Sequence, residues 1–568
     1  MTVALVGTGP VVETVSIALE DVDVTVVETG IEGVETADLA VVTGTAGGDG
    51  FGRANDLAIA GGTPWIAVEV GGIGGVAVDE IHATVAAFEP GGPCFECLER
   101  RVEATEVDAA SEPTADRNGV RIAGAYAGHL ATRFLSGDSP GGVVIEIPHV
   151  ERTLLPVPGC TCTVERERSF ELKATSRSLE ESIVRGEVSI DDRIGLIEQI
   201  GEYDSFPAPY YLSVLSDTSV FSDVAAPDRA AGVALDWDTA FMKATGESLE
   251  RYSAAVYRNE TFHRAPIEDV TGPSPRDFVR PDDWTDPDPE TVVEWVPGRD
   301  LETGDDVYLP AGNVHFPSPD TRFAPGITTG LGLGNGTVEA IVSGLCEVIE
   351  RDATMIGWYS TFEPLGLDVG DETFETLSRR AGAEGLSVTP TLVTQDIDVP
   401  VVTVAVHRDA WPQFAVGSAA DPDVSAAAVS ALAEALQNWM ELREMGRAKA
   451  STAEGAIGRY ADRPEGVEEL LEPDSVVPAA HVGPAEAPTG KPALDFLLER
   501  MVSAGLESFA ARITPRDVEQ LGFEAVRVLV PEAQPLFVDE PLFGDRAREV
   551  PADLGFEPRL DRDFHPYP

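Results

Sequence analysis

Positive charge is scarce in this sequence. Its 568 residues include 40 lysines and arginines against 98 acidic residues, which gives a formal net charge of −58 at pH 7. Proteins that bind nucleic acids need basic surfaces to neutralise phosphates, so we expect no nucleic-acid partner. The acidity is spread along the whole chain, and 43% of the residues are hydrophobic. This combination predicts a folded, halophilic protein, because molar salt shortens the Debye length to about 3 Å and screens the self-repulsion.

Long apolar runs and cysteines are also scarce. No run approaches the roughly twenty apolar residues that a membrane span needs, so we expect no membrane association. The N-terminus opens on a strand-like run, Val3–Val6, without the basic segment of a signal peptide, which predicts a cytoplasmic protein. Only five cysteines occur, and four of them form two close pairs. That spacing favours metal binding over disulfides.

Among the features that are present, the segment 336–352 is central. Its apolar residues recur at helical spacing, so it predicts one amphipathic helix. Glu347 and Glu350 are three residues apart and Ser343 lies one turn before Glu347, which places all three on one face. Neighbouring carboxylates repel each other unless a cation lies between them. A hard ion such as Mg²⁺, carrying nucleotide phosphates, is the natural candidate.

The same pattern occurs a second time. Glu247, Glu250 and Arg251 have the relative spacing of Glu347, Glu350 and Arg351. A third helix-like segment, 431–441, carries Glu434, Gln437 and Glu441. In so acidic a chain, chance alone gives roughly seventeen acidic pairs at spacing three, most of them on solvated faces. The repeated Glu-x-x-Glu-Arg within apolar helices nevertheless favours three helices converging on one phosphate and metal site.

The first residues predict a small α/β unit. Thr2–Pro10 and the residues that follow suggest a strand, a glycine turn and a helix, and 22–28, 39–43 and 65–69 are further strand-like runs. Gly7 and Gly9 match half of a dinucleotide-binding fingerprint, but Val12 occupies the place of its third glycine. Such a turn more often serves a doubly wound sheet without a nucleotide.

The paired cysteines lie at the end of this unit. Cys94 and Cys97 form a Cys-x-x-Cys pair, and Cys160 and Cys162 form a Cys-x-Cys pair. Four thiolates match a closed tetrahedral zinc site, and the absence of histidine among them indicates a structural rather than a catalytic ion. The alternative is a set of unrelated buried or redox-active cysteines.

Three motifs in this region carry a resemblance. They are Pro93–Arg101, the helical segment 123–128 and the closing Pro158–Cys162. In this order after a degenerate Gly-x-Gly start, they resemble the ThiF-like domain of azoline-forming peptide cyclodehydratases. The resemblance implies a Rossmann-like domain over residues 1–165 that holds a structural zinc and helps to present a precursor peptide. It does not imply an ATP site there.

The remainder of the chain resembles the YcaO family. The matching segments are Ser178–Ile183, Gly246–Ser253, Gly332–Ala340, Leu345–Asp352, Ala431–Gln437, Val528–Leu536 and His565–Pro568. The resemblance implies a YcaO domain over residues 166–568 that binds ATP with Mg²⁺. The expected fold class is therefore α/β and α+β, with a small Rossmann-like zinc domain followed by the ATP-binding domain.

The resemblance also implies roles for individual residues. Glu247, Glu250, Glu347 and Glu350 are the expected magnesium and phosphate ligands. Arg251 and Arg351 either contact phosphate or form local ion pairs. The C-terminal carboxylate of Pro568 is the candidate catalytic base by family analogy. The residues expected to complete the nucleotide site are Ser182, Ser343, Glu434 and Gln437. The position of Asn335 just before the central helix also suggests that it lies near phosphate.

Several positions depart from the family pattern. Phe564 stands where the proline-rich tail of cyclodehydratase members has its first proline, and 231–234 replaces a Gly-Lys-Gly sequence. Asn438 and Trp439 replace a common arginine. The glycine run 326–336 lacks the Gly-Lys-Ser/Thr ending of a P-loop and instead suits a tight entry into the central helix. Residues 163–178 predict a linker, and the proline-rich 271–290 predicts a surface insertion.

The leading functional hypothesis is an ATP-dependent cyclodehydratase that forms thiazoline or oxazoline from Cys, Ser or Thr of a ribosomally made peptide, as in bacteriocin biosynthesis. One alternative is backbone thioamidation with external sulfide. Another is a catalytically silent scaffold that binds the precursor peptide. The expected cofactors are ATP, Mg²⁺ and structural Zn²⁺. The expected partners are the precursor peptide, a flavin-dependent dehydrogenase and a second copy of the chain.

Overall fold

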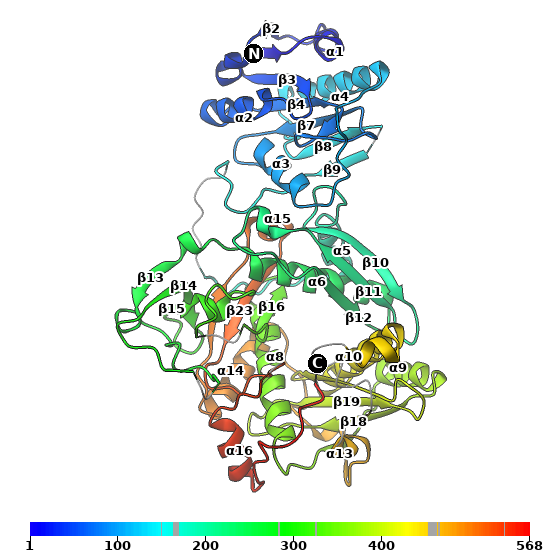
Figure 1. The fold of residues 1–568 in the computed structure, drawn as a ribbon, viewed down its shortest axis with the longest axis vertical. Helices are drawn as coiled ribbons and strands as arrows, with labels where there is room; N and C mark the ends of the chain where they lie inside the picture. The colour runs from blue at the N-terminus through cyan, green and yellow to red at the C-terminus, as the bar shows by residue number, and fades with distance from the viewer. Residues whose placement is uncertain are drawn as a thin grey trace.

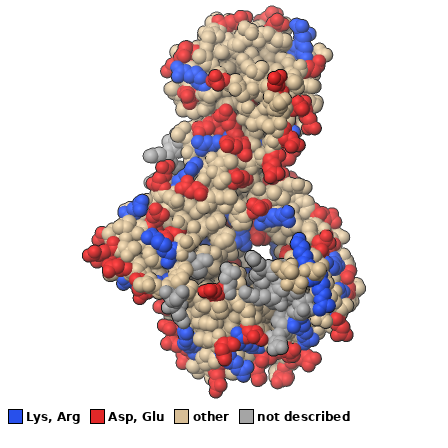
Figure 2. Space-filling model, in the orientation of Figure 1, with Lys and Arg blue, Asp and Glu red and all other residues tan. Residues whose placement is uncertain are grey.

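The computed structural model describes residues 1–148, 150–162, 170–281, 284–323, 326–452, 463, 466–538 and 540–567. An N-terminal unit forms the upper part of the molecule in Figure 1, and the rest of the chain forms a larger body below it. Acidic side chains are scattered over both parts on the face seen in Figure 2. No helix among the described residues is long and apolar enough to cross a membrane.

The N-terminal unit is built on a seven-stranded sheet of order β2-β1-β3-β4-β7-β8-β9. Its first four strands pair in parallel and the last three are antiparallel. Alternate strand residues face opposite sides, so Val3 and Leu5 pack under α1 and α4 while Ala4 packs on the other side. The strands are β1 (Thr2–Val6), β2 (Thr25–Thr29), β3 (Leu39–Thr45), β4 (Trp65–Val70), β7 (Ala83–Phe88), β8 (Val143–Ile147) and β9 (Val150–Thr153).

Helices cover both faces of this sheet. The helices α1 (Pro10–Ala18) and α4 (Arg117–Leu135) lie on one face, and α2 (Gly50–Gly61) and α3 (Phe95–Glu103) lie on the other. The short strands β5 (Gly72–Ile73) and β6 (Val76–Ala77) form a separate hairpin. This arrangement confirms the Rossmann-like unit and the strands expected at 3–6, 39–43 and 65–69. The strand expected at 22–28 begins later, at Thr25 of β2.

The larger body contains three further sheets. A three-stranded antiparallel sheet packs against α6, and α5 packs against the same helix. A sheet of order β13-β14-β22-β23-β16, with β15 also paired to β14, and one of order β20-β19-β18-β17-β21 flank the central helix α8. Figure 1 shows α8 between these two sheets. The mixed α/β and α+β fold class is confirmed.

The bounds of the body's elements are as follows. Its strands are β10 (Ile197–Asp204), β11 (Tyr210–Leu215), β12 (Arg229–Val233), β13 (His263–Pro266), β14 (Val292–Asp300), β15 (Asp306–Pro310), β16 (Leu331–Gly334), β17 (Leu365–Asp368), β18 (Ser387–Leu392), β19 (Val401–His407), β20 (Phe414–Ala420), β21 (Val476–Pro478), β22 (Phe509–Arg512) and β23 (Glu524–Leu529). Its helices are α5 (Leu179–Glu187), α6 (Trp237–Ala255), α7 (Ala311–Val314), α8 (Thr337–Trp358), α9 (Glu372–Ala383), α10 (Val424–Met445), α11 (Arg447–Ala450), α13 (Glu468–Leu471), α14 (Lys491–Ser503), α15 (Arg516–Leu521) and α16 (Arg546–Leu554).

The glycine run before α8 is a packing seam. A Cβ atom added to Gly332 would lie 2.1 Å from the carbonyl oxygen of Ala340, and one added to Gly344 would lie 2.7 Å from that of Gly330. A Cβ atom at Gly336 would lie 2.4 Å from the carbonyl oxygen of Lys173. These distances are too short for any side chain. Gly332 and Gly344 therefore let β16 and α8 approach closely, and Gly336 lets the segment 173–175 lie against the start of α8, which supports the tight strand-to-helix entry.

The boundary expected between residues 165 and 166 falls within 163–169, which lies outside the described residues. The division into 1–165 and 166–568 therefore stays a prediction. The segment 271–290 carries no helix or strand where it is described, between the 3₁₀ turn ending at Asp269 and β14.

Candidate active site

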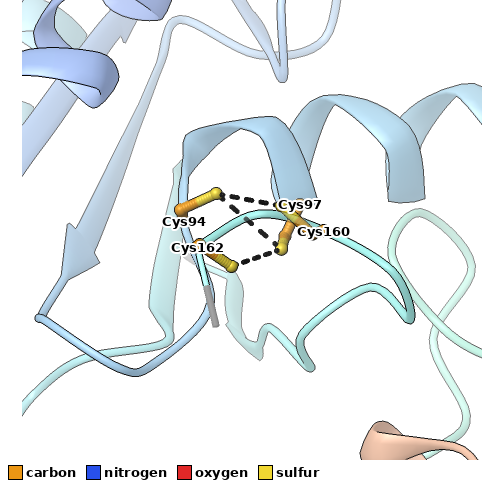
Figure 3. Close-up of side chains that lie close together, drawn as sticks. All are labelled: Cys94, Cys97, Cys160 and Cys162. Atoms are coloured by element: carbon orange, nitrogen blue, oxygen red, sulfur yellow. Dashed lines mark hydrogen bonds between the residues drawn. The ribbon is translucent and has the colours of Figure 1, made fainter. Parts of the chain in front are cut away.

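The four paired cysteines form one cluster at the base of the N-terminal unit (Figure 3). Cys94 precedes the first turn of α3 and Cys97 lies on it, while Cys160 and Cys162 come from the loop after β9. The sulfur atoms of Cys94 and Cys160 are 3.6 Å apart, as are those of Cys97 and Cys162. All four sulfurs lie within 4.8 Å of one another, and none forms a disulfide.

This geometry fits zinc. Four sulfurs at the Zn–S distance of about 2.3 Å form a tetrahedron whose edges are about 3.8 Å, which matches the observed spacing. The backbone N–H of Val157 donates to the sulfur of Cys97 at 3.3 Å and would stabilise a thiolate there. Cys94, Cys97 and Cys160 are buried. With all four positions taken by protein sulfur, the ion would be structural.

The two Glu-x-x-Glu helices bring their carboxylates together. Glu247 and Glu250 lie on α6, and Glu347 lies on α8. Burial raises the pKa of Glu250 to about 8, and the nearby charges of Glu347 and Glu247 add to this rise. Backbone N–H groups hold two of these side chains: Ala231 donates to Glu247 at 3.3 Å and Gly330 donates to Glu347 at 2.9 Å.

A second group of carboxylates joins α8 to α10. Glu350 on α8 is 8% exposed, and the hydroxyl of Ser418 on β20 donates to it at 2.7 Å. Burial raises the pKa of Glu350 to about 8, and the charge of Glu434 on α10 adds to the rise. The backbone N–H of Ser418 donates to Glu434 at 2.7 Å. Ser418 therefore links Glu350 to Glu434, and the three expected helices do converge.

The arginines of both motifs form ion pairs within their own helices. Arg251 lies 3.4 Å from the carboxylate of Glu247. Arg351 lies 3.4 Å from Glu350 and 3.9 Å from Glu347. These contacts favour the local ion-pair role that the sequence left open.

The glutamates are more widely spaced than the cysteines. Across the described ranges, the cysteine cluster is the only group of three or more His, Cys, Asp or Glu whose ligand atoms all lie within 4.8 Å of one another. A bare magnesium ion would need carboxylates closer than this. The arrangement fits the alternative in which phosphate oxygens and waters supply most magnesium ligands, as Mg²⁺ usually requires. We call Glu247, Glu250, Glu347, Glu350 and Glu434 the carboxylate cluster.

Other expected residues lie on two sides of the carboxylate cluster. The hydroxyl of Ser182, which is 5% exposed, donates to the side-chain oxygen of Asn335 at 3.1 Å. This pair lies at the N-terminal end of α8, and Ser343 lies exposed on the helix. Glu347 lies ten residues, or about 15 Å, beyond the first residue of α8. On the other flank, Gln437 donates to Glu441 at 3.2 Å.

Sequence reasoning missed two cations beside the carboxylates. Arg527 on β23 is 3% exposed and donates to the carbonyl oxygens of Thr328 and Ile327 at 2.7 and 2.8 Å. Burial lowers its pKa to about 10, and the carboxylates of Glu347 and Glu250 oppose this. Lys243 lies one turn before Glu247 on α6. Its position on the Glu247 face was the signal that sequence analysis had available, whereas Arg527 offered none.

The end of the chain approaches the carboxylate cluster at Glu350. Tyr567 is 2% exposed and packs with side chains from α8, β20 and α10. Burial raises the pKa of Tyr567 to about 12, and the charge of Glu350 contributes. His565 is also buried and lies against Phe564. Pro568, the expected catalytic residue, lies outside the described residues, so its role stays a prediction.

A buried network joins the cysteine cluster to α6. Arg101 lies one turn after Cys97 on α3 and donates to the hydroxyl of Tyr252 at 3.2 Å and to the carboxylate of Asp517. Tyr252 also donates to Asp517. All three residues are 0% exposed, and Tyr252 lies two residues after Glu250. We call Arg101, Tyr252 and Asp517 the buried triad.

A Rossmann-like unit with a four-cysteine cluster, attached to a body in which three acidic helices meet, defines a two-part α/β protein with a carboxylate cluster. The sequence profile described as YcaO cyclodehydratase, ATP- and Mg²⁺-binding, matches residues 231–534, which is more than half of the chain. The chain therefore belongs to the YcaO family. The resemblance predicted from the sequence is confirmed.

Individual relatives extend this result. A protein of Methanothermobacter thermautotrophicus, described as uncharacterized, is 28% identical over 325 residues, which are 53% of this chain and 80% of that one. A solved heterocyclase in complex with substrate and cofactor has a TM-score of 0.76 at 18% identity and covers 98% of this chain and 83% of its own. The heterocyclase TruD has a TM-score of 0.68 at 17% identity, with 98% and 82% covered. These two likenesses show a shared fold that includes the N-terminal unit.

Proposed function

We propose that this protein is an ATP- and Mg²⁺-dependent peptide cyclodehydratase. The observation that carries the proposal is that two Glu-x-x-Glu-Arg helices, α6 and α8, bring their glutamates together in a chain of the YcaO family. Glu247, Glu250, Glu347 and Glu350 would hold magnesium together with the ATP phosphates. Bound magnesium would neutralise charge on the phosphates.

The proposed reaction proceeds through phosphorylation of the amide oxygen. The thiol or hydroxyl of a Cys, Ser or Thr residue attacks the preceding amide carbonyl carbon and loses its proton, and the carbonyl π electrons move to oxygen. That oxygen takes the γ-phosphoryl group of ATP, and ADP leaves. Phosphate then departs with the oxygen while the amide nitrogen loses its proton and forms the C=N bond of the azoline. Positioning and electrostatic stabilisation supply most of the rate in such transfers.

Hydrogen bonds from the chain's own residues hold the glutamate side chains of the carboxylate cluster in place. Gly330 and Ala231 fix Glu347 and Glu247 through backbone N–H groups, and Ser418 ties Glu350 to Glu434. The pair Ser182–Asn335 would bind the nucleotide at the far end of α8, with Ser343 between. Gln437 would complete the site on α10.

The proposed partners follow from the chemistry. The substrate is a precursor peptide presented by the N-terminal unit, whose four cysteines would hold zinc. Oxidation of an azoline to an azole removes two electrons and so needs an electron acceptor, and a flavin-dependent dehydrogenase stays a proposed partner. A homodimer and a halophilic cytoplasmic setting also stay predictions.

The test is peptide-dependent ATP hydrolysis in high salt, with mass spectrometry of a Cys-, Ser- and Thr-containing peptide. A loss of about 18 Da per modified residue supports the azoline product, and a gain of about 16 Da indicates thioamidation instead. ATP turnover without either change, or none at all, contradicts the proposal.

A matched pair of variants sharpens this test. Glu434→Gln should lower ATP turnover at least about 100-fold, because Glu434 lies beside Glu350 in the carboxylate cluster. Glu444→Gln, on the same helix but exposed, should retain wild-type turnover. Equal activity of the two variants would remove α10 from the site.

A further inference from the structure

A cavity lies on the side of α8 next to the carboxylates. It has a volume of about 70 Å³ and is bounded by α7, α8, β23 and the loops before β14 and β16. Its apolar wall includes Phe278, Ile327, Val348 and Val528. This volume is roughly five times the smallest space that holds a water molecule, so a small organic group fits. We call it the Arg527 cavity.

Two residues that line the cavity each carry a buried polar atom with no hydrogen-bond partner among the described residues. The Nε–H of Arg527 is buried and donates to no acceptor among the described residues, although the two terminal nitrogens of this guanidinium bind carbonyl oxygens. The side-chain oxygen of Asn313 on α7 is buried and accepts from no donor in the same ranges. An unpaired buried polar atom costs about 1–3 kcal/mol, so this donor and this acceptor are suited to a ligand that supplies both partners.

The cavity adjoins the carboxylate cluster. Arg527 lines the cavity and also interacts electrostatically with Glu347 and Glu250. Val348 lines it and directly follows Glu347 in α8. A group bound in the cavity therefore lies next to the proposed phosphate site rather than on a distant surface.

We propose that the Arg527 cavity binds the amide group of the peptide substrate that is to be activated. In this arrangement the amide oxygen accepts from Nε–H of Arg527 and the N–H of the peptide donates to the side-chain oxygen of Asn313. The side chain of the residue before the nucleophile packs against Phe278 and Val348. The inference rests on the proposed function, because it assigns the substrate's place in that same site.

The chemistry of the reaction matches this assignment. The amide oxygen becomes negatively charged when the nucleophile attacks, and a buried cation aimed at that oxygen stabilises the charge strongly because water is excluded. Arg527 is such a cation and lies next to the carboxylates that would hold magnesium and phosphate. Removing one donor of this kind typically lowers kcat by about 10²–10³. Arg527 would then be a catalytic residue.

The adenine base of ATP is the rival occupant of an apolar cavity with these polar atoms. An amide explains the observations better, because the unpaired donor belongs to a cation next to the expected phosphoryl acceptor. A base needs no cation. The experiment must nevertheless separate the two occupants.

Binding of a small amide measures the proposal without any turnover. The probe is N-acetyl-L-alanine-N′-methylamide, titrated by ligand-observed NMR against the full chain in high salt with ADP and Mg²⁺. We expect saturable binding to the wild type and at least about tenfold weaker binding to Asn313→Leu and to Arg527→Lys, which keeps the charge but removes Nε–H. ADP affinity should change less than twofold in Asn313→Leu. The matched control is Gln395→Leu, which removes another unpaired buried amide oxygen outside the cavity.

A gain of binding covers the case in which a variant folds poorly. Phe278→Ala enlarges the cavity, so this variant should bind N-acetyl-L-leucine-N′-methylamide more tightly than the wild type does. No probe binding by the wild type, or equal binding in all variants, overturns the proposal. A tenfold loss of ADP binding in Asn313→Leu without a change for the amide also overturns it, in favour of adenine. Absence of azoline with intact probe binding would instead refute only the proposed function.

Discussion

Replacing Asp517 by asparagine tests how strongly the N-terminal unit and the ATP-binding body are joined. Asp517 is 0% exposed and accepts from both Arg101 and Tyr252. The substitution keeps the shape of the side chain but leaves the guanidinium of Arg101 as a buried cation without a counter-charge. Breaking a buried ion pair in this way costs about 3–5 kcal/mol. That loss is a large part of the total stability of an ordinary domain.

Two further variants separate charge from hydrogen bonding. Tyr252→Phe removes only the hydroxyl and leaves the ion pair of Arg101 with Asp517, so we expect a loss of about 1–3 kcal/mol. Adding Arg101→Met to Asp517→Asn removes the stranded charge, so the double variant should be more stable than Asp517→Asn alone. The measurement is denaturant unfolding at fixed molar salt, followed by circular dichroism.

A functional readout distinguishes linkage from simple stability. Tyr252 lies two residues after Glu250 on α6, so loosening the buried triad should shift that carboxylate and raise the KM for ATP in Tyr252→Phe. Two results would refute the view that the triad is one coupled unit. One is wild-type stability in Asp517→Asn, and the other is a double variant whose loss of unfolding free energy equals the sum of the losses in the two single variants.

Three further predictions concern the metal and proton sites. Cys94→Ser combined with Cys160→Ser should lose bound zinc in elemental analysis, and unchanged zinc would end that assignment. Because burial raises the pKa of both Glu250 and Glu350 to about 8 and magnesium needs both carboxylates ionised, affinity for a Mg²⁺–ATP analogue should rise about 100-fold from pH 7 to 9, and only about tenfold in Glu350→Gln. Glu69 is buried, which raises its pKa to about 7. Its neutral form therefore adds about 3 kcal/mol to the free energy of unfolding below about pH 4.5, and this contribution is lost as pH rises through 7. Glu69→Gln should remove this dependence of the unfolding free energy on pH. A dependence that persists in Glu69→Gln would contradict the assignment.

Local patterns predicted much of the fold and the site. Helical spacing identified α6 and α8 with their carboxylates, strand-like runs identified β1, β3 and β4, and cysteine spacing identified the cluster. Each of these signals lies within a few residues, where side-chain periodicity follows directly from helix or strand geometry.

Long-range partners could not be predicted in this way. Arg527 reaches the carboxylates only because β23 pairs with β16, nearly two hundred residues earlier in the chain. Asp517 meets Arg101 across 416 residues. Neither position belongs to a motif, and tertiary packing alone gives each its neighbours. The ion pairs of Arg251 and Arg351, by contrast, follow from helix geometry, but the sequence could not choose between them and phosphate contacts.

The glycine seam between β16 and α8 has a consequence for mutational scanning. Gly332, Gly336 and Gly344 admit no side chain, because any Cβ would meet backbone or side-chain atoms of a neighbouring element. An alanine scan judged by lost activity would score these positions as strongly as true ligands. It would therefore assign a nucleotide-binding loop to glycines that are needed for close packing. Scoring each variant for folded yield before enzymatic output would tell the joint apart from the ligands.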